Sequence, residues 1–468
     1  MNNISIWKDT SERTYYKKLD KDIDIDVLII GGGITGVSTL YHLKDSKPKV
    51  ALVEQNKIAY STTGNSTGKL TYLQNDLLDK IRKSVGDKKS FSYISFEIEG
   101  MNRMVKLIND KKFDCDLTCV DSYLYTNKES EVDKLKDLSK FLNNRSIVTK
   151  EEECNLIESK YMIGVENTYM INPIKFVNCL IKDNKYPIYE NTSIIKIEKE
   201  YDKYISYTKN NKIISKWIVI ASHYPYFIKP MFFPIKVSLE KSYLSASKKK
   251  IDDISLISYS NPFISIRTYK DYLIYLSNSH ALNKDIDDKH NFNELLKKVS
   301  DLKLKTSFLW SNIDIMTVDG MPYIGKIKDN MLIGTGYNTW GLINGFMAGV
   351  ILSDIIKNKD NKYIDLFNPN RFSVKSIPKY ISNTFKNVDG YIKGFKSNVD
   401  IDYKEGKKVL NVDNHTVLKK CPHIGCGLKY NEIEKTWDCP CHGSRFSIDG
   451  KCISGPANKD ISISSKKM

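Results

Sequence analysis

The residues with the clearest chemical potential are cysteines and histidines near the carboxyl end of the chain. Cys421 and His423 form a C-x-H motif, and Cys439 and His442 form a C-x-x-H motif shortly after it. In a cytosolic protein, such a terminal group indicates a metal site more than a disulfide framework. Two thiolates and two imidazoles can hold zinc tetrahedrally, so zinc is one candidate from the spacing alone.

A second motif lies near the amino end, where residues 31–36 read Gly-Gly-Gly-Ile-Thr-Gly and satisfy G-x-G-x-x-G. The apolar run 26–30 predicts a strand, the spacing over 34–43 predicts a helix, and 49–54 predicts a second strand ending at Glu54. A βαβ unit of this kind presents glycine backbone and a helix N-terminus to a pyrophosphate, and an acid to ribose hydroxyls. The pattern therefore predicts a parallel α/β dinucleotide-binding domain.

The acid at position 54 also limits which dinucleotide can bind. A carboxylate there favours an unphosphorylated ribose, which leaves FAD and NAD and disfavours NADP. Residues 61–69 form a segment rich in hydroxyls and glycine that can wrap the diphosphate and ribityl chain of a flavin. Such a segment is also common as a solvated loop, so by itself it only favours FAD.

The elements that would position these motifs are spread along the chain. Period-2 segments at 193–198, 204–207 and 263–276 predict strands of an α+β substrate domain interleaved with the nucleotide domain. Residues 330–336 predict another strand, and a helix is expected to begin near Gly341. A polar, lysine-rich stretch after Arg371 predicts the boundaries: an oxidoreductase body over 1–371, a linker over 372–400 and a small domain over 401–468.

The amino-acid composition argues against nucleic acids as binding partners and against a membrane span. The chain has 468 residues, 41% hydrophobic and 27% charged, with a net charge of +16. Most of its 72 basic residues are lysines scattered along the chain, which indicates a solvated surface and argues against nucleic acid, where arginine clusters are usual. No apolar run approaches the ~18–20 residues of a membrane span, and the start is not a secretory signal, so a cytoplasmic protein is expected.

Five segments carry a family resemblance: 26–36, 62–70, 217–222, 310–325 and 334–341. They resemble the FAD-dependent oxidoreductases of the D-amino-acid oxidase and glycine oxidase superfamily over most of residues 1–371. The resemblance implies a Rossmann-type, glutathione-reductase-like fold that holds FAD extended along the first βαβ unit. It places Ile195 and Ala221 at the adenine end and the turn 334–342 over the flavin ring. The FAD-binding residues indicated by motif and resemblance are Gly31, Gly33, Ile34, Thr35, Gly36, Glu54, Thr62, Thr63, Thr67, Gly68, Lys69, Ile195, Ala221, Gly334, Gly336, Asn338, Trp340, Gly341 and Leu342.

The substrate pocket is less distinct in the sequence. Family members that oxidise amino acids commonly hold the carboxylate with an arginine and a tyrosine. By this resemblance Arg267 and Tyr243 are the candidate catalytic residues, with Tyr269 nearby in sequence and Lys241 as a further basic residue. An arginine on a strand beside packed tyrosines is an equally good interpretation of the same residues.

The flanks of the cysteine and histidine motifs carry a second resemblance. Residues 421–426, 437–446, 449–450 and 455–457 are similar to a Rieske domain, and the similarity spans about residues 400–468. It implies a [2Fe-2S] cluster in which Cys421 and Cys439 bind one iron while His423 and His442 bind the other. Cys426 and Cys441 match the second cysteine pair of that family, which implies a disulfide between them.

Three neighbours of the predicted ligands refine this interpretation. Ser444 matches the serine that donates a hydrogen bond to cluster sulfur, whereas Phe446 stands where the members of highest potential have a tyrosine hydroxyl. The missing hydroxyl predicts a reduction potential below those members but above ferredoxins. No role is predicted for Cys452.

The predicted FAD-binding body and the predicted Rieske domain together predict a function. FAD would accept electrons from an amine or amino acid, and the cluster would pass them on to an external acceptor such as a redox protein. One alternative is an electron-transfer protein between protein partners, without a small-molecule substrate of its own. Another is a redox-regulated binding protein with the Cys426 and Cys441 pair as its sensor.

Overall fold

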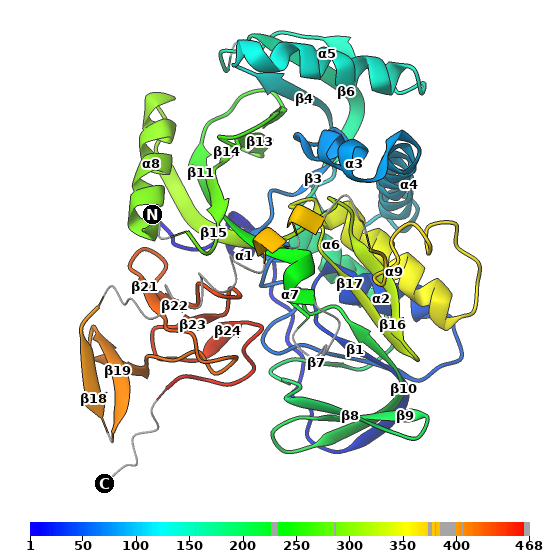
Figure 1. The fold of residues 1–468 in the computed structure, drawn as a ribbon, viewed down its shortest axis with the longest axis vertical. Helices are drawn as coiled ribbons and strands as arrows, with labels where there is room; N and C mark the ends of the chain where they lie inside the picture. The colour runs from blue at the N-terminus through cyan, green and yellow to red at the C-terminus, as the bar shows by residue number, and fades with distance from the viewer. Residues whose placement is uncertain are drawn as a thin grey trace.

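The computed structural model consists of a large flavoprotein-like body and a small β domain docked on its side (Figure 1). It describes residues 1–154, 156–225, 233–284, 287–372, 377–379, 381–383, 399–404 and 406–462. Most of the predicted linker 372–400 therefore lies outside the described residues. The two parts are in direct contact, and the small domain lies beside the body's strand β15 (Thr306–Thr317).

The first sheet of the body is built around the predicted βαβ unit. Its strands follow the order β16 (Tyr323–Lys328), β17 (Met331–Thr335), β10 (Lys212–Ile220), β1 (Ile23–Ile30), β2 (Val50–Val53) and β7 (Ile188–Tyr189). The neighbours from β17 to β7 are parallel, while β9 (Lys203–Tyr207) joins β10 and β8 (Lys196–Glu200) in an antiparallel extension. The buried apolar residues of β1 and β2 explain why these strands lie at the centre, covered on both faces.

Helices cover this sheet and pack closely on one another. Helix α2 (Ile34–Leu43) lies against α9 (Gly341–Ile356), which begins where the sequence predicts. A side chain at Gly349 would meet the Ser38 side chain at 2.3 Å, so glycine permits this close approach. The other helices of the body are α1 (Ile6–Thr10), α3 (Leu77–Val85), α4 (Asp87–Lys111), α5 (Glu129–Asn143), α6 (Pro173–Lys182), α7 (Phe233–Lys236) and α8 (Asp288–Asp301), with a 3₁₀ turn at Thr63–Asn65.

The second sheet of the body supplies the predicted substrate domain. Its order is β15, β11 (Val237–Lys248), β14 (Tyr272–Ala281), β13 (Ser265–Tyr269), β12 (Ser255–Ser258), β4 (Thr118–Thr126), β6 (Tyr161–Met170) and β3 (Lys69–Leu70), and β5 (Lys150–Glu151) pairs with β6. Its strands come from segments interleaved with those of the first sheet. Helix α8 packs on β11 and β14, and α5 packs on β4 and β6. One face is therefore covered by helices, and the other faces the nucleotide half.

The small domain is all-β. One sheet contains β18 (Ile401–Lys404), β19 (Lys407–Val412) and β20 (His415–Leu418), and the other contains β21 (Lys429–Asn431), β22 (Thr436–Asp438), β23 (Arg445–Ser447) and β24 (Cys452–Ser454). Its core includes Trp437 and Phe446, both fully buried, together with the cysteines. The predicted fold class, an α/β FAD-type body with an interleaved substrate domain and a small all-β domain, is confirmed.

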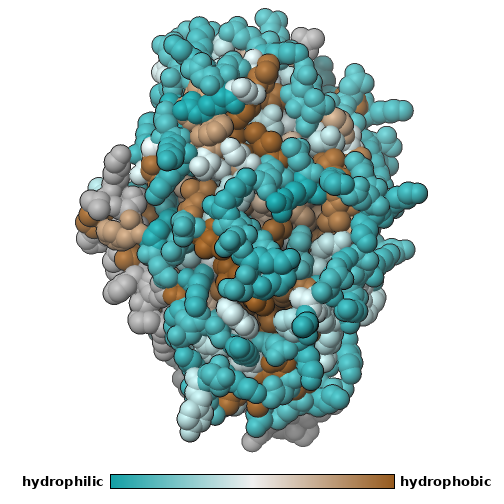
Figure 2. Space-filling view, turned by 90° about the vertical axis from the view of Figure 1, so that its right-hand side faces the viewer, coloured by the Kyte–Doolittle hydropathy of each residue, from teal (hydrophilic) through white to brown (hydrophobic). Residues whose placement is uncertain are grey.

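The surface is predominantly hydrophilic. Figure 2 shows hydrophilic residues over most of one face, with hydrophobic residues mainly in the recesses between them. Among the described residues, no helix is both long and apolar enough to cross a membrane.

Candidate functional site: a flavin cleft shared with an iron–sulfur domain

The glycine turn after β1 has the backbone geometry that a dinucleotide requires. Gly31 has a φ of +113°, and a side chain there would meet the backbone oxygen of Ala221 at 2.4 Å. A side chain at Gly36 would meet the Gly31 oxygen at 1.9 Å, so α2 can approach the turn only through glycine. Gly33 caps the start of α2 without any side chain, and the Ile34 N–H donates to the Thr63 hydroxyl at 3.1 Å, so the helix N-terminus and Thr63 together border the position of a phosphate.

Glu54 lies at the end of β2, as predicted for a ribose ligand. Its carboxylate accepts hydrogen bonds from the backbone N–H of Gly32 at 2.7 Å and of Asn56 at 2.8 Å. Burial raises the pKa of Glu54 above its usual range, an effect that the backbone hydrogen bonds oppose. These contacts hold the carboxylate beside the glycine turn.

The turn and Glu54 border a cleft of about 400 Å³. The predicted FAD-binding residues that line it are Gly31, Gly33, Ile34, Thr35, Glu54, Thr62, Thr63, Ala221, Gly334, Gly341 and Leu342. These residues come from six separate segments of the chain. A glycine-walled cradle next to a helix N-terminus and an acid fits FAD.

Some predicted FAD residues lie outside this lining. Asn338 is buried, and its side chain holds the turn 334–342 in place. It accepts a hydrogen bond from the Thr317 N–H at 2.7 Å and donates one to the Gly320 oxygen at 2.8 Å. Ile195 does not line the cleft, whereas its buried neighbour Ile194 does. Gly36, Thr67, Gly68, Lys69, Gly336 and Trp340 also lie outside the lining.

The side chain of Arg267 is buried and binds backbone carbonyl oxygens. It is 1% exposed, and its guanidinium donates to the carbonyl oxygens of Thr67, Gly68, Ile171 and Thr268 at 2.7–3.1 Å. It does not line the cleft. The donors of Arg267 hold the end of the 61–69 loop against the second sheet, and its substrate-binding role stays a prediction.

Tyr243 lies on the helix-covered face of the second sheet. Its hydroxyl donates to Asp288, the first residue of α8, at 2.5 Å and contacts His280 at 3.0 Å, and its ring packs on Phe292. Tyr243 does not line the cleft, although Ser311, its partner in the strand register, does. The catalytic role of Tyr243 stays a prediction.

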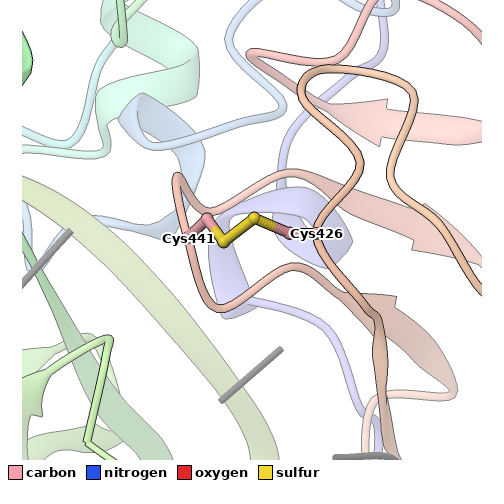
Figure 3. Close-up of a disulfide and its surroundings, with 2 residues drawn as sticks. All are labelled: Cys426 and Cys441. Atoms are coloured by element: carbon pink, nitrogen blue, oxygen red, sulfur yellow. A yellow bond between two sulfur atoms is a disulfide. The ribbon is translucent and has the colours of Figure 1, made fainter. Parts of the chain in front are cut away.

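In the small domain, two loops bring the predicted cluster ligands together. The loop from Cys421 to Cys426 and the loop from Cys439 to Ser444 are joined by a Cys426–Cys441 disulfide (Figure 3). The sulfurs of Cys426, Cys439 and Cys441 all lie within 4.8 Å of one another, but the disulfide occupies two of them. Of these three, only the Cys439 thiol is left to bind a metal.

The two histidines complete the donor set. The rings of His423 and His442 lie 5.0 Å apart between centroids. Burial lowers the pKa of His442 to about 4, so the ring is neutral, and its Nδ1 is buried without a hydrogen-bond partner in the described part of the chain. A neutral imidazole nitrogen without a protein partner, close to two thiols, fits an iron ligand of a Rieske cluster.

The neighbours of the ligands agree with the same cluster. Ser444 is fully buried, accepts from the Ala457 N–H at 3.0 Å and lies within hydrogen-bond reach of the Cys421 sulfur. Phe446 is fully buried in the cysteine core and has no hydroxyl to offer. Cys452, for which no role is predicted, is buried, and its sulfur accepts from the Gln55 side chain of the body at 3.0 Å.

The cluster loops and the flavin cleft meet. His442, Gly443 and Arg445 line the same cleft as the glycine turn. Tyr224, three residues after Ala221, is buried, and its ring lies 5.1 Å from that of His442 and 6.4 Å from that of His423. Sequence motifs gave no sign of this shared wall, because it depends on how the two domains dock.

A buried ion network fixes the docking. Lys241 on β11 binds Asp288 at 2.7 Å and Asp438 of the small domain at 2.8 Å. Arg445 binds Asp438 at 3.1 Å and Glu434 at 2.7 Å. Burial opposes the charged form of Asp438, yet Arg445 and Lys241 hold its pKa well below the usual range. Lys241, indicated by the resemblance only as a further basic residue, contacts the small domain and is a docking residue.

The fold and the two sites define a flavoprotein oxidoreductase that carries an iron–sulfur domain. The FAD dependent oxidoreductase family matches residues 26–355, and the Rieske [2Fe-2S] domain family matches residues 401–465. The chain therefore belongs to the FAD-dependent oxidoreductases, with FAD as cofactor, and its carboxyl-terminal domain is a Rieske domain that binds a [2Fe-2S] cluster. This confirms the two resemblances seen in the sequence.

Individual relatives agree with this assignment. The Rieske-type iron–sulfur protein YhfW of Bacillus subtilis is 27% identical over 97% of this chain and 96% of its own length. Gamma-glutamylputrescine oxidoreductase of Escherichia coli is 20% identical over 74% of this chain and 87% of its own. The glycine oxidase structure from Geobacillus kaustophilus shares the fold with a TM-score of 0.62 and 16% identity, over 75% of this chain and 99% of its own.

Proposed function

We propose that this oxidoreductase oxidises an amine or amino acid and passes the electrons through its Rieske cluster to an external acceptor. The observation that carries the proposal is the shared cleft: His442 lines the same cavity as the glycine turn of the FAD site. A cluster ligand at this position gives electrons a route from one cofactor site to the other within a single chain.

The cofactors divide the chemistry. FAD accepts two electrons from the C–H bond next to an amine nitrogen, whereas a Rieske cluster carries one electron at a time. The chain's own residues hold the two sites in position. The N-terminus of α9 directs its positive end at the turn that lines the flavin side of the cleft, where it would stabilise negative charge. Tyr224 fills the space between Ala221 and the two histidines.

The substrate class rests on the family and on the cleft. The named relatives act on amine nitrogen compounds, as glycine oxidase and gamma-glutamylputrescine oxidoreductase. Neither Arg267 nor Tyr243 reaches the cleft. Asp314 does line it, opposite Glu240 in the strand register, and burial with the neighbouring Glu240 raises its pKa to about 7. The acidic side chain of Asp314 in this wall would attract the positive charge of an amine substrate, whereas it would repel the carboxylate of an amino acid.

A redox protein is the acceptor we infer, because a one-electron centre delivers electrons singly.

We further infer that the protein works in the cytoplasm and that the Cys426–Cys441 disulfide persists there because it is enclosed in the cluster domain. Trapping free thiols with a mass label before cell lysis checks this point. The disulfide predicts that neither cysteine takes the label.

The proposed substrate oxidation and electron transfer can be tested without oxygen. The holoprotein is mixed with amines and amino acids one at a time, while flavin absorbance and cluster EPR are followed on the same samples. The proposal expects one group of amines to bleach the flavin, followed by a reduced-Rieske signal. If dithionite reduces both centres while no compound bleaches the flavin, the substrate-oxidising function is wrong and protein electron donors are favoured.

A further inference from the structure

One segment of the Rieske domain forms a wall of the cleft away from the cluster ligands. Ile453 and Ser454 of β24, together with Gly455, line the cavity, and a side chain at Gly455 would lie 3.7 Å from the side chain of Gln55, the residue after Glu54. This part of the cavity differs from the wall made by His442, because none of these three residues is a predicted cluster ligand.

The body holds this segment from one side through the residue that follows Glu54. Gln55 donates from its side-chain nitrogen to the backbone oxygen of Ala457 at 3.1 Å and to the Cys452 sulfur at 3.0 Å. The predicted ribose-binding acid and the contact to the Rieske domain are thus adjacent in sequence. A shift of the Rieske segment would pull directly on the end of β2.

The body also holds the segment from a second side. Asn458 donates to the backbone oxygen of Ile194 at 3.3 Å, and its own backbone oxygen accepts from Ser193 at 3.5 Å. Ile194 is buried and lines the cleft. Residues 452–458 are therefore attached at both of the body segments that frame the adenosine end.

Ile453 gives this wall an unusual character. It is 40% exposed although it is a large apolar residue that lines a cavity. Small-molecule sites are lined mainly by apolar side chains with a few polar groups that fix orientation. Ile453 and Glu54 line the same cleft, and this combination of an apolar side chain and a carboxylate matches the pattern for an adenosine, whose base has apolar faces and whose ribose carries hydroxyls.

We propose that the Rieske domain is part of the FAD-binding site, with residues 453–455 closing over the adenosine half of the cofactor. FAD binding and docking of the Rieske domain then stabilise each other, because a coupling between two sites acts equally in both directions. This inference does not depend on which substrate is oxidised or on where the electrons go.

The first test measures FAD affinity in the full-length, cluster-loaded protein after removal of its FAD. Ile453→Ser and Ile453→Ala are compared with Ile401→Ser, which changes an exposed isoleucine of the same domain on β18, outside the cleft. We expect Ile453→Ser to raise the FAD dissociation constant roughly five- to tenfold and Ile453→Ala to raise it less, through lost apolar contact. Ile401→Ser leaves it unchanged. Equal dissociation constants for all variants and the parent protein would overturn the proposal.

The second test needs no substitution. Hydrogen exchange of backbone amides is followed in the FAD-free protein before and after FAD is added. The proposal expects slower exchange over residues 452–458 and no change over the strand pair β18 and β19. Unchanged exchange over 452–458 would contradict it. Neither test involves turnover, so failure here leaves the proposed oxidase function standing, and failure of the substrate test leaves this inference standing.

Discussion

The cluster site and the flavin cleft are built in opposite ways. The four cluster ligands come from two short loops, 421–426 and 439–444, which one disulfide ties together. The cleft draws its lining from segments scattered between residues 8 and 455 and from both domains. Loss of any one of the four ligands should prevent cluster binding, whereas loss of one of the many cleft residues should only weaken cofactor binding. Variants of the two sites are therefore expected to differ in kind as well as in size.

The largest effect is expected from Cys439→Ala. The variant lacks one of the two sulfur ligands of an iron, so we predict complete loss of bound iron and of the reduced-Rieske EPR signal. Cys452→Ala is the matched control, since it removes another buried cysteine of the same core and leaves the ligand set intact. A cluster that still assembles in Cys439→Ala would contradict the assigned ligands.

The junction between the two sites provides the second prediction. Lys241→Met removes the buried cation from the partly buried Asp288 and from Asp438, which keeps its ion pair with Arg445. Breaking a buried ion pair costs up to about 3–5 kcal/mol of stability. Scanning calorimetry should show a lower unfolding temperature. Lys289→Met removes the exposed ion pair with Glu432 at the same interface and should change stability by less than about 1 kcal/mol. Equal effects of the two variants would show that the buried network does not fix the docking.

A graded loss is expected in the cleft. Glu54→Gln removes the charge that accepts from the Gly32 and Asn56 amides and that faces the predicted ribose position. Hydrogen bonds to charged groups contribute about 1.5–3 kcal/mol, so FAD affinity should fall by about tenfold or more. Titration of the FAD-free protein measures this fall, and Glu200→Gln on β8 serves as the control. Undiminished affinity would remove Glu54 from the site.

The smallest effect concerns the cluster potential. Phe446→Tyr adds a hydroxyl within the cysteine core, where it can donate to a ligand sulfur. A hydrogen bond contributes about 1 kcal/mol and 59 mV corresponds to about 1.4 kcal/mol for one electron, so the potential should rise by about 40 mV. A redox titration followed by EPR measures it. An unchanged potential would mean that the phenylalanine does not set it.

The same contrast explains which parts could be predicted from sequence. The ligands Cys421, His423, Cys439 and His442 lie close together in the chain, so their spacing and flanks indicate their chemistry directly. The βαβ unit is equally local, and the predicted helix start at Gly341 agrees with α9. Local patterns carry enough information when the site itself is local.

Residues whose role depends on strand faces or docking could not be predicted. Tyr243 and Arg267 are candidates by family resemblance, but their contacts with Asp288 and with the Gly68 carbonyl join residues far apart in the chain. The contacts of Lys241 with Asp438 and of Gln55 with Ala457 join residues far apart in the chain. Nothing in either local sequence encodes such a partner.

The most direct test of the account is the rate at which the cluster is reduced after the flavin. A bleaching substrate is mixed anaerobically with the holoprotein at several protein concentrations, and the reduced-Rieske EPR signal is followed in rapidly frozen samples. The shared cleft predicts a first-order rate constant that does not change with protein concentration. A rate proportional to protein concentration, or a cluster that stays oxidised while the flavin is bleached, would contradict electron transfer within one chain.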